Sequence, residues 1–491
     1  MTLGQLLLYV GIAAIFVSLI VAFIFKKKND WLTTYLQSFC GCLFLFSGWV
    51  KAVDPMGTAY KLENYFTEFE STFEGSWFSF IAPLFPLLSE YGIWLSVGTV
   101  VFEILLGIML ILGLFPKFTS WAFTLLILFF TGLTGFTYLT GYVPDGINFF
   151  EFSKWGEYNK TNMKVTDCGC FGDFLILEPK VSFLKDIFLL IPSFYFIFFH
   201  KKFHQLIENK AISRSIVGLS TLGLIVYCLS NYMWDLPQAD FRPFNKGKDV
   251  KKQREAELDA MASIKILAWK LKNKESGKVV ELSNDIYMKE FKNYPKAEWE
   301  VVDQIKSEPA IKASKISEME FTNMDGNDVT DEILDSQESI FVIIAKKLEG
   351  KAVSSKVTVQ DSIFAVDTIH LDNGNSELVK SFMGLEDKQV TKTNYKWDSK
   401  YIDNYKTKVV PLIQEAAKNK IKSYIVVGGA DPTMINAFEE EVESGAQFLT
   451  ADDILLKTIV RSNPGITLWK GGKILNKWHI SQFPGYEKLD I

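Results

Sequence analysis

Long apolar stretches, separated by short charged ones, dominate the chain up to residue 235. A helix of about 17–25 mostly apolar residues is long enough to cross a lipid bilayer. The pattern therefore predicts six membrane spans: Leu3–Phe25, Trp31–Lys51, Tyr91–Leu114, Phe118–Thr140, Phe183–Phe199 and Ser215–Tyr232. The first span has no basic segment before it and no small-residue cleavage site, so we expect it to be a retained helix and not a signal peptide.

Basic residues are distributed unequally between the two sets of loops that join these spans. One set is short and basic, with Lys26, Lys27, Lys28, Lys117, Lys201, Lys202, Lys210 and Arg214. The other set, residues 52–90 and 141–182, is longer and carries only Lys61, Lys154, Lys160, Lys164 and Lys180. Because cytoplasmic loops are enriched in Lys and Arg, we expect a bacterial inner-membrane protein with both termini in the periplasm. In the first long loop, the amphipathic stretch Tyr60–Phe69 is expected to lie on the membrane interface.

The pattern changes after the Pro-punctuated stretch Leu236–Pro243, which we interpret as a linker. Residues 264–305 alternate in a way that predicts a small β unit with a turn at Gly277. Beyond residue 318, strand-like and helix-like segments alternate, which argues for a sheet covered by helices. The expected strands are Phe341–Ala345, Ser423–Val427 and Ile466–Trp469, and the expected helices are Val410–Asn419, Thr433–Val442 and Asp453–Val460. An insertion at about residues 347–406, with its own strand-like run Ser362–Ile369, interrupts this alternation.

Charge and cysteine content narrow the functional classes. The 491 residues carry a net charge of −5 without a basic stripe of interleaved aromatic residues, so we expect no nucleic-acid partner. The five cysteines all lie before residue 235, at Cys40, Cys42, Cys168, Cys170 and Cys228. A large cysteine-free region beside a cysteine-bearing membrane part fits an oxidising compartment, where a stray thiol is a liability. No nucleophile elbow, P-loop or dinucleotide fingerprint supports another enzyme class.

The second long loop contains two cysteines separated by a single glycine, Cys168-Gly169-Cys170. The glycine permits a tight fold that brings the cysteine Cα atoms within the roughly 4.4–6.8 Å that a disulfide tolerates. Such a small, strained ring would be easily reduced, which suits thiol exchange. Asp167 and Asp173 would oppose thiolate formation unless a cation offsets them. The alternatives are a loop staple, an inert pair, or a metal site, which would need more N or S donors than this loop supplies.

Charged residues inside or next to the spans are further candidates. Glu103 lies near the middle of the third span, where a charge is costly and usually implies a function or a partner. Lys51, Asp54, Lys185 and Asp186 lie near the outer ends of the second and fifth spans, close to the level of the cysteine loop. These groups form either a structural polar network or a proton path or quinone-head pocket. Candidate partners of Glu103 are Thr131, Thr134 and Lys51. We expect Lys185 to stabilise a thiolate and Asp186 to anchor a lysine.

Other polar residues are expected to be unremarkable. Cys40 and Cys42 are two apart on a helix and point to different faces, so they form no local site, and we interpret them and Cys228 as packing residues. His200 and His204 have the i, i+4 spacing of metal ligands. They stand among lysines at a cytoplasmic helix end, however, so we expect a solvated basic flank and no metal.

Several motifs carry a resemblance to known families. The run Leu45–Gly57, with Lys61 and Glu63, resembles the first-helix signature of DoxX-like membrane proteins. The run Asp167–Asp173, followed by Ser182-Phe183 and Lys185-Asp186, resembles the motif of the related MauE-type redox-associated proteins. Asp240–Pro243 and Lys457–Gly465 resemble a DoxX subgroup that has an extra periplasmic domain.

The resemblance implies a fold for both halves of the chain. It implies a four-helix membrane core, formed by the second to fifth spans, and a thioredoxin-like α/β domain. In that domain Asp325–Val329 would form the first hairpin, and Pro464, at the place of the thioredoxin proline, would follow a cis bond. A thioredoxin needs a CxxC pair after its central strand, and Lys346–Gly350 stands there instead. The domain is therefore expected to dock a partner without dithiol chemistry.

These observations together predict five regions. They are an extra N-terminal helix (1–30), the four-helix core (31–205), a sixth span and linker (206–245), the small β unit (246–308) and the degenerate thioredoxin-like domain (309–491). The favoured hypothesis is an inner-membrane component of periplasmic thiol homeostasis, with Cys168, Cys170, Lys185, Asp186 and Glu103 as site residues. Electrons would pass between the cysteine pair and a quinone or a partner protein. The alternative is a non-enzymatic scaffold of a cell-envelope complex.

Overall fold

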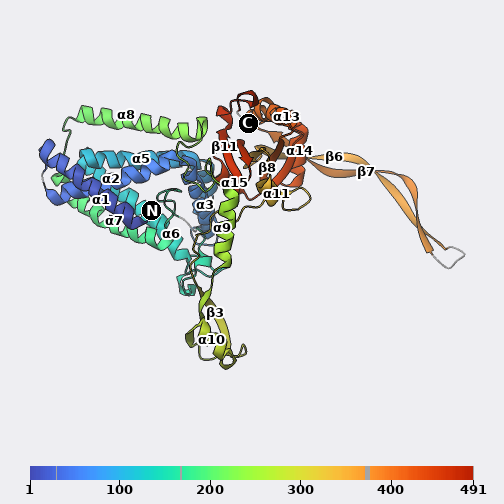
Figure 1. Cartoon of the computed structure of the whole chain (residues 1–491), viewed down its shortest axis with the longest axis horizontal. Coiled ribbons are helices and arrows are strands. Elements are labelled where there is room, and N and C mark those ends of the chain that lie inside the picture. The colour runs from blue at the N-terminus through green and yellow to red at the C-terminus, as the bar shows by residue number, and fades with distance from the viewer. Residues whose placement is uncertain (29, 166–167, 371–375, 490–491) are drawn as a thin grey trace. The chain divides into compact units, whose positions relative to one another are not determined.

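The structure, a computed structural model, describes residues 1–28, 30–165, 168–370 and 376–489. The chain divides into two compact units, residues 1–245 and 246–491. The first unit is helical, and the second combines sheets with helices (Figure 1). The predicted fold class, a bundle of membrane helices followed by a separate α/β region, is thereby confirmed.

The first unit contains the six predicted membrane helices. They are α1 (Leu3–Leu19), α2 (Trp31–Val53), α5 (Gly92–Leu112), α6 (Pro116–Thr140), α7 (Pro179–Phe199) and α8 (Lys210–Leu229), and further turns continue α1 to Ile24, α7 to Lys202 and α8 to Trp234. Helices α6 and α7 begin earlier than hydropathy predicted, at Pro116 and Pro179. A proline suits the first helical turn, because the N–H that it lacks would have no helical partner there.

Small residues set the close contact between α2 and α5. A Cβ atom added to Gly107 of α5 would lie 2.9 Å from the carbonyl oxygen of Gly41 of α2. A Cβ atom on Gly48 would lie 2.4 Å from the Ile104 side chain. In a membrane, where lipid tails are as apolar as the helices, such small residues let helices approach and gain packing contacts. The rotation of α2 against α5 is therefore fixed by glycines, and it decides which later side chains of α2 face α5.

Two helices of the first long loop cover the loop end of the bundle: α3 (Pro55–Glu74) and α4 (Leu84–Glu90). Helix α3 begins after Asp54, whose carboxylate accepts a hydrogen bond from a first-turn N–H. The ring of Phe69 on α3 packs against Phe136 of α6, with 4.8 Å between ring centroids. The expectation that the aromatic side of Tyr60–Phe69 lies on the membrane interface stays a prediction, and the ring of Phe69 is half-buried.

The second unit begins with α9 (Val250–Ala262) and a three-stranded antiparallel sheet of order β2-β1-β3. The strands are β1 (Ile266–Asn273), β2 (Val279–Ser283) and β3 (Trp299–Lys306), with α10 (Asn284–Glu290) between the last two. Gly277 has a φ of +67°, a left-handed conformation that glycine adopts without strain, in the connection between β1 and β2. The predicted small β unit is therefore present as a sheet.

A six-stranded sheet of order β11-β10-β5-β8-β9-β4 forms the centre of the second unit. Its strands are β4 (Thr322–Asn323), β5 (Ile340–Ala345), β8 (Lys422–Gly428), β9 (Gln447–Ala451), β10 (Gly465–Lys470) and β11 (Lys473–His479). Strands β5, β8 and β9 are parallel, whereas β10, β11 and β4 pair antiparallel. The helices are α11 (Thr330–Asp335), α12 (Ser399–Asn404), α13 (Val410–Lys418), α14 (Pro432–Val442) and α15 (Asp453–Ile459). The three predicted strands and three predicted helices are present, whereas β4, β9 and β11 were not predicted.

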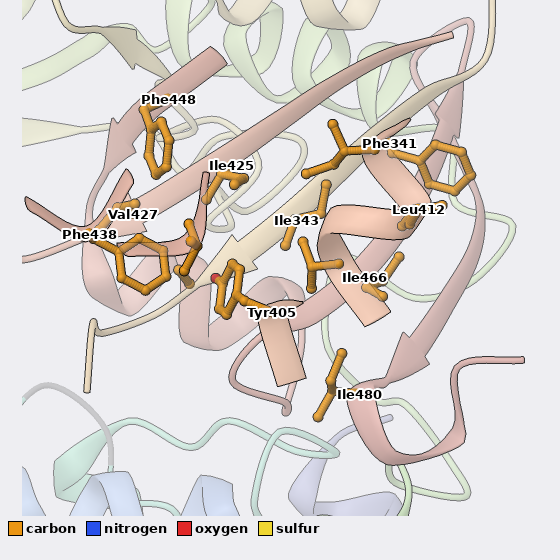
Figure 2. Close-up of a cluster of buried hydrophobic side chains, with 14 of the residues drawn as sticks. Phe341, Ile343, Tyr405, Leu412, Ile425, Val427, Phe438, Phe448, Ile466 and Ile480 are labelled. Carbon is orange, nitrogen blue, oxygen red and sulfur yellow. The ribbon is translucent and has the colours of Figure 1, made fainter. Parts of the chain in front are cut away.

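The core of this sheet is apolar on both faces. Every residue of β5 is buried, as expected for a central strand with helices or loops on each side. Figure 2 shows Ile343 and Ile425 of neighbouring strands beside Tyr405 and Leu412 of the covering helices. This cluster accounts for the separate fold of the second unit.

The predicted insertion forms a long antiparallel hairpin of β6 (Gly350–His370) and β7 (Ser376–Trp397), which extends away from the sheet (Figure 1). At its base, the ring of Trp397 packs against Phe438 of α14, 5.3 Å between centroids. The strand-like run that the sequence predicted is thus part of a ribbon that follows β5 directly.

Candidate functional site

A cavity of about 60 Å³ lies inside the first unit, between α2, α3, α5, α6, α7 and the cysteine loop. Its polar lining includes Lys51, Lys61, Tyr65, Glu103, Thr134, Cys168, Cys170, Lys185 and Asp186. The fold thus brings all five predicted site residues to one place, although they come from three separate segments of the chain.

The first polar contact in this cavity joins α2 to α5. The Nζ atom of Lys51 donates a hydrogen bond of 2.7 Å to Oε2 of Glu103, and both side chains are buried. Gly48, one turn before Lys51, lets α2 lie against α5 at the level of Ile104. The prediction that Glu103 faces the bundle interior with a polar partner is confirmed, and that partner is Lys51. Of the other two candidates, the hydroxyl of Thr131 donates to a carbonyl of its own helix.

The second polar contact joins α7 to α6. Lys185 forms an ion pair with its neighbour Asp186, whose other carboxylate oxygen accepts a 3.0 Å hydrogen bond from the hydroxyl of Thr134. Asp186 is fully buried, and Lys185 also lies over the ring of Phe171, with Nζ 5.8 Å from the centroid. Asp186 therefore anchors Lys185, as predicted. The hydroxyl of Thr134, a predicted partner of Glu103, donates to Asp186 instead.

The cysteine loop is held against the bundle by its backbone. The hydroxyl of Ser47 on α2 donates a 2.8 Å hydrogen bond to the carbonyl oxygen of Cys170. Gly169 and Gly172 have φ values of +61° and +51°, a left-handed conformation that favours glycine. The two cysteines of the predicted pair, Cys168 and Cys170, form no disulfide with each other in the described structure, and both are half-buried. Asp167, which the sequence suggested as an opposing charge, lies outside the described residues.

Burial and charge act in opposite directions on the loop thiol. Burial is the main cause that raises the pKa of the Cys170 thiol above its ordinary value, and the positive charge of Lys185 is the main effect that lowers it. Burial also raises the pKa of Tyr65 on α3, and the neighbouring Cys168 raises it further. The tyrosine therefore stays protonated, and its hydroxyl lies 2.7 Å from that of Thr137.

Sequence reasoning missed Tyr65 and Lys61 as cavity residues. A signal was available, because Ala59, Leu62 and Tyr65 recur at three-residue spacing and all three are buried on one face of α3. A tyrosine in an apolar stripe usually brings its hydroxyl to a polar partner. That spacing indicated a hydroxyl pointing into the bundle.

Some of the remaining residues named in the sequence analysis lie as predicted, and one does not. Cys40 and Cys228 are buried, as expected for packing residues. The expectation of a solvated flank is wrong for His204, which is fully buried, with its Nε2 atom 2.8 Å from the carbonyl oxygen of Ile111. The backbone N–H of His204 donates to Oε1 of Gln37 on α2, and its ring lies against the end of α5, so tertiary packing overrides the local lysine-rich sequence. Within the described residues, no group of three or more His, Cys, Asp or Glu side chains is arranged to hold a metal ion.

In the second unit, Pro464 directly precedes β10, at the position that the resemblance predicted for the thioredoxin proline. The Asn463–Pro464 bond is cis, as the resemblance implied. The side-chain amide of Asn463 donates to the carbonyl oxygen of Lys347 at 2.9 Å and to Oε1 of Glu349 at 3.2 Å. Asn463 and the cis proline therefore lie beside Lys346–Gly350, the segment after β5. In a thioredoxin, the CxxC pair would follow the central strand at this place.

These features define a membrane protein whose helical bundle encloses a polar cavity with two thiols, joined to a separate α/β unit. Residues 29–145 match the model of a membrane family described as methylamine utilisation protein MauE. The match includes Lys51 and Glu103 and ends before the cysteine loop. It confirms that the chain resembles MauE over residues 29–145, whereas the MauE-like motif predicted at Asp167–Asp173 and the resemblance to DoxX stay predictions. No curated protein and no solved structure matches the chain.

Proposed function

We propose that this protein is a bacterial inner-membrane component of thiol–disulfide chemistry on the periplasmic side, with Cys168 and Cys170 as the exchanging pair. The observation that carries the proposal is the shared cavity, in which both cysteines lie beside two buried ion pairs. Buried charges inside a membrane bundle are costly and mark functional positions more often than structural ones.

The two cysteines have different roles in this proposal. As a disulfide, the pair accepts two electrons and two protons from the dithiol of a partner protein, which itself becomes a disulfide. Burial raises the pKa of the Cys170 thiol, and the hydroxyl of Ser47 holds the backbone of Cys170 against α2, so this sulfur is shielded from a partner protein. Cys168 is therefore the sulfur that meets the partner's thiolate, and Cys170 is the sulfur that leaves.

The positive charge of Lys185 assists the leaving sulfur. A departing thiolate at Cys170 is disfavoured by burial, and the nearby lysine offsets part of that cost. Asp186 and Thr134 keep this lysine in place. Lys185 and Asp186 are therefore positioning residues, and the Lys51–Glu103 pair keeps α2 and α5 in register on the opposite wall.

The α/β unit is proposed to be a thioredoxin-like docking domain. Its mixed sheet, with Pro464 placed beside Lys347 and Glu349, supports this assignment. Residues 246–491 contain no cysteine, so this unit carries out no dithiol chemistry. In the proposal it binds a partner protein, and electron transfer takes place in the bundle.

The proposed orientation rests on the basic residues of the short loops. A periplasm-dependent reporter fused after Trp234 is expected to be active, and a reporter fused after Lys28 is expected to be inactive. Activity of the Lys28 fusion alone would invert the topology and overturn the periplasmic assignment.

Thiol trapping in cells tests the exchange itself. Free thiols are alkylated rapidly, the sample is reduced, and newly released thiols receive a second label. We expect Cys168 and Cys170 to move between the two labels when the growth medium is made oxidising or reducing. Cys168→Ser should remove mixed disulfides with partner proteins, whereas the control Cys228→Ser, at a buried cysteine, should leave them unchanged. A pair that keeps one redox state in all media would contradict the proposal.

The second candidate function is a scaffold in a membrane complex. The observation that favours it is that both ion pairs also brace helices, α2 to α5 and α7 to α6. A scaffold needs only packing from the two loop cysteines. It predicts that the double variant Cys168→Ser/Cys170→Ser co-purifies with the same proteins as the wild type and that no mixed disulfide is trapped.

A further inference from the structure

The long hairpin of β6 and β7 carries an apolar patch in its outer half. Phe364 pairs with Phe382 across the two strands, and their ring centroids lie 5.9 Å apart. Val366 and Leu385 lie on the same face, because residues two apart on a strand, and residues directly opposite each other, point to the same side. All four side chains are more than half exposed, so this face of the ribbon is apolar and open.

A two-stranded ribbon cannot cover such a face by itself. A hairpin without a third strand or a helix against it is at best marginally stable in water. At the base of the ribbon α14 supplies this cover, because Trp397 packs on Phe438. The outer half extends away from the central sheet (Figure 1), so another surface has to cover the apolar patch.

Two opposite charges frame the apolar patch. On the same face of β7, the order from the outer to the inner end is Lys380, Phe382, Leu385 and Asp387, and both charged side chains are exposed. Four successive cross-strand pairs hold these residues, and a rise of about 3.3 Å per residue puts the two charges about 20 Å apart. Lys380 and Asp387 are therefore too far apart to form an ion pair with each other within one ribbon.

We propose that this face is where two copies of the protein associate, ribbon against ribbon and antiparallel. A two-fold axis between the Phe382 and Leu385 positions lays β7 of one copy over β7 of the other. Lys380 then meets Asp387 of the second copy, and Phe382 meets its Leu385. Because a two-fold interface uses the same patch on both sides, each of these contacts occurs twice.

The charge pattern favours a second copy over other occupants, and it also selects the orientation. An anionic lipid surface attracts clusters of basic residues, whereas this patch has one acidic residue for its one basic residue. In a parallel arrangement, Lys380 would lie over Val366 of the second copy. Asp387 would likewise lie over Gln360, so no ion pair would form. The antiparallel arrangement covers the apolar side chains and pairs the charges at the same time.

The proposed contact is small. Four cross-strand pairs of a two-stranded ribbon bury less than the roughly 1,200 Å² of a standard protein interface. We therefore expect a reversible association, which is best measured with both copies confined to one membrane.

The experiment uses the full-length protein in phospholipid vesicles, as a mixture of copies fused to donor and acceptor fluorescent proteins. Energy transfer measured over a range of lipid-to-protein ratios gives the association constant. We expect Lys380→Glu and Asp387→Lys each to lower it about tenfold, because each reversal creates two like-charge contacts per dimer. The double variant Lys380→Glu/Asp387→Lys restores opposite charges and should associate as the wild type does. Glu386→Lys, on the opposite face of the ribbon, is the matched control and should change nothing.

Chemical coupling locates the contact. A carbodiimide activates a carboxylate, which then forms an amide with an ammonium group that lies against it, and the reagent leaves as a urea. In a mixture of unlabelled and isotope-labelled copies, we expect mass spectrometry to find Lys380 of one copy joined to Asp387 of the other.

Two outcomes would overturn the proposal. Charge reversals that leave energy transfer unchanged, or a double variant that stays as weak as the single ones, would contradict the antiparallel contact. Absence of energy transfer in the wild type would exclude association through this face and would leave the apolar patch to a different protein or to lipid.

Discussion

The polar cavity of the helical bundle and the central sheet of the α/β unit are lined by different kinds of buried side chain. The helical bundle encloses two ion pairs, Lys51–Glu103 and Lys185–Asp186, at the level of a thiol-bearing loop. The central sheet of the α/β unit instead encloses aliphatic and aromatic side chains such as Ile343. A buried ion pair is weak evidence for stability, because its desolvation can exceed its Coulomb attraction. The difference supports the proposed division, in which the bundle holds the chemistry and the sheet provides packing.

The largest expected effect comes from breaking one ion pair of the bundle. Glu103→Ala leaves Lys51 buried without its partner, and removing one member of a buried pair costs about 3–5 kcal/mol. Thermal unfolding in detergent should show a correspondingly lower midpoint. The double variant Lys51→Met/Glu103→Leu replaces both charges by apolar groups and should recover most of the loss. If the double variant is as unstable as Glu103→Ala, uncompensated charge is not the cause.

A packing defect in the α/β unit should be next in size and different in consequence. Leu412→Ala removes a buried side chain beside the sheet and should cost about 2–5 kcal/mol of the free energy of unfolding of that unit. Leu267→Ala, at a side chain that is 53% exposed, is the matched control and should have little effect. Alkylation of Cys168 in the bundle should be unchanged by both substitutions. Altered alkylation in Leu412→Ala would mean that the two units do not divide chemistry and packing as proposed.

A smaller effect is expected from the hydrogen bond that anchors the second ion pair. Thr134→Val keeps the shape of the side chain and removes its hydroxyl, which leaves one buried oxygen of Asp186 without this donor. The cost should be about 1–3 kcal/mol in the stability of the bundle. Thr131→Val is a suitable control on the same helix, because its hydroxyl bonds only to its own backbone in the described contacts. Equal destabilisation by the two variants would show that the contact to Asp186 contributes nothing.

The smallest expected effect concerns the protonation of Cys170. Because its pKa is raised, the reactive thiolate forms only at a higher pH than in an ordinary cysteine, whose pKa is about 8.5. In a Cys168→Ser background, alkylation of Cys170 by a small reagent should therefore accelerate at a pH above that of a cysteine peptide measured in parallel. Alkylation that accelerates at or below the pH of the peptide would show that the charge of Lys185 outweighs burial and that the Cys170 thiol is not shielded as proposed.

The sequence alone determined the architecture of this protein. Apolar stretches of membrane-spanning length predicted the six helices, and the alternation of apolar strands and amphipathic helices predicted the α/β unit. Both patterns are local, so they can be read without knowing which element packs on which. The missed strand β9 shows the limit, because its short run, Gln447–Ala451, becomes a strand only through pairing with β8.

Only the tertiary structure decided how the site is assembled. Sequence reasoning named Lys51 among three partners for Glu103 and expected Asp186 to hold a lysine, but it assigned neither Thr134 to Asp186 nor Tyr65 to the cavity. These pairings depend on how each helix is rotated against its neighbour. That rotation is set by contacts such as the glycine contact of α2 with α5, between residues far apart in the chain. The same reason explains His204, which the local sequence placed in solvent and the fold of the chain buried.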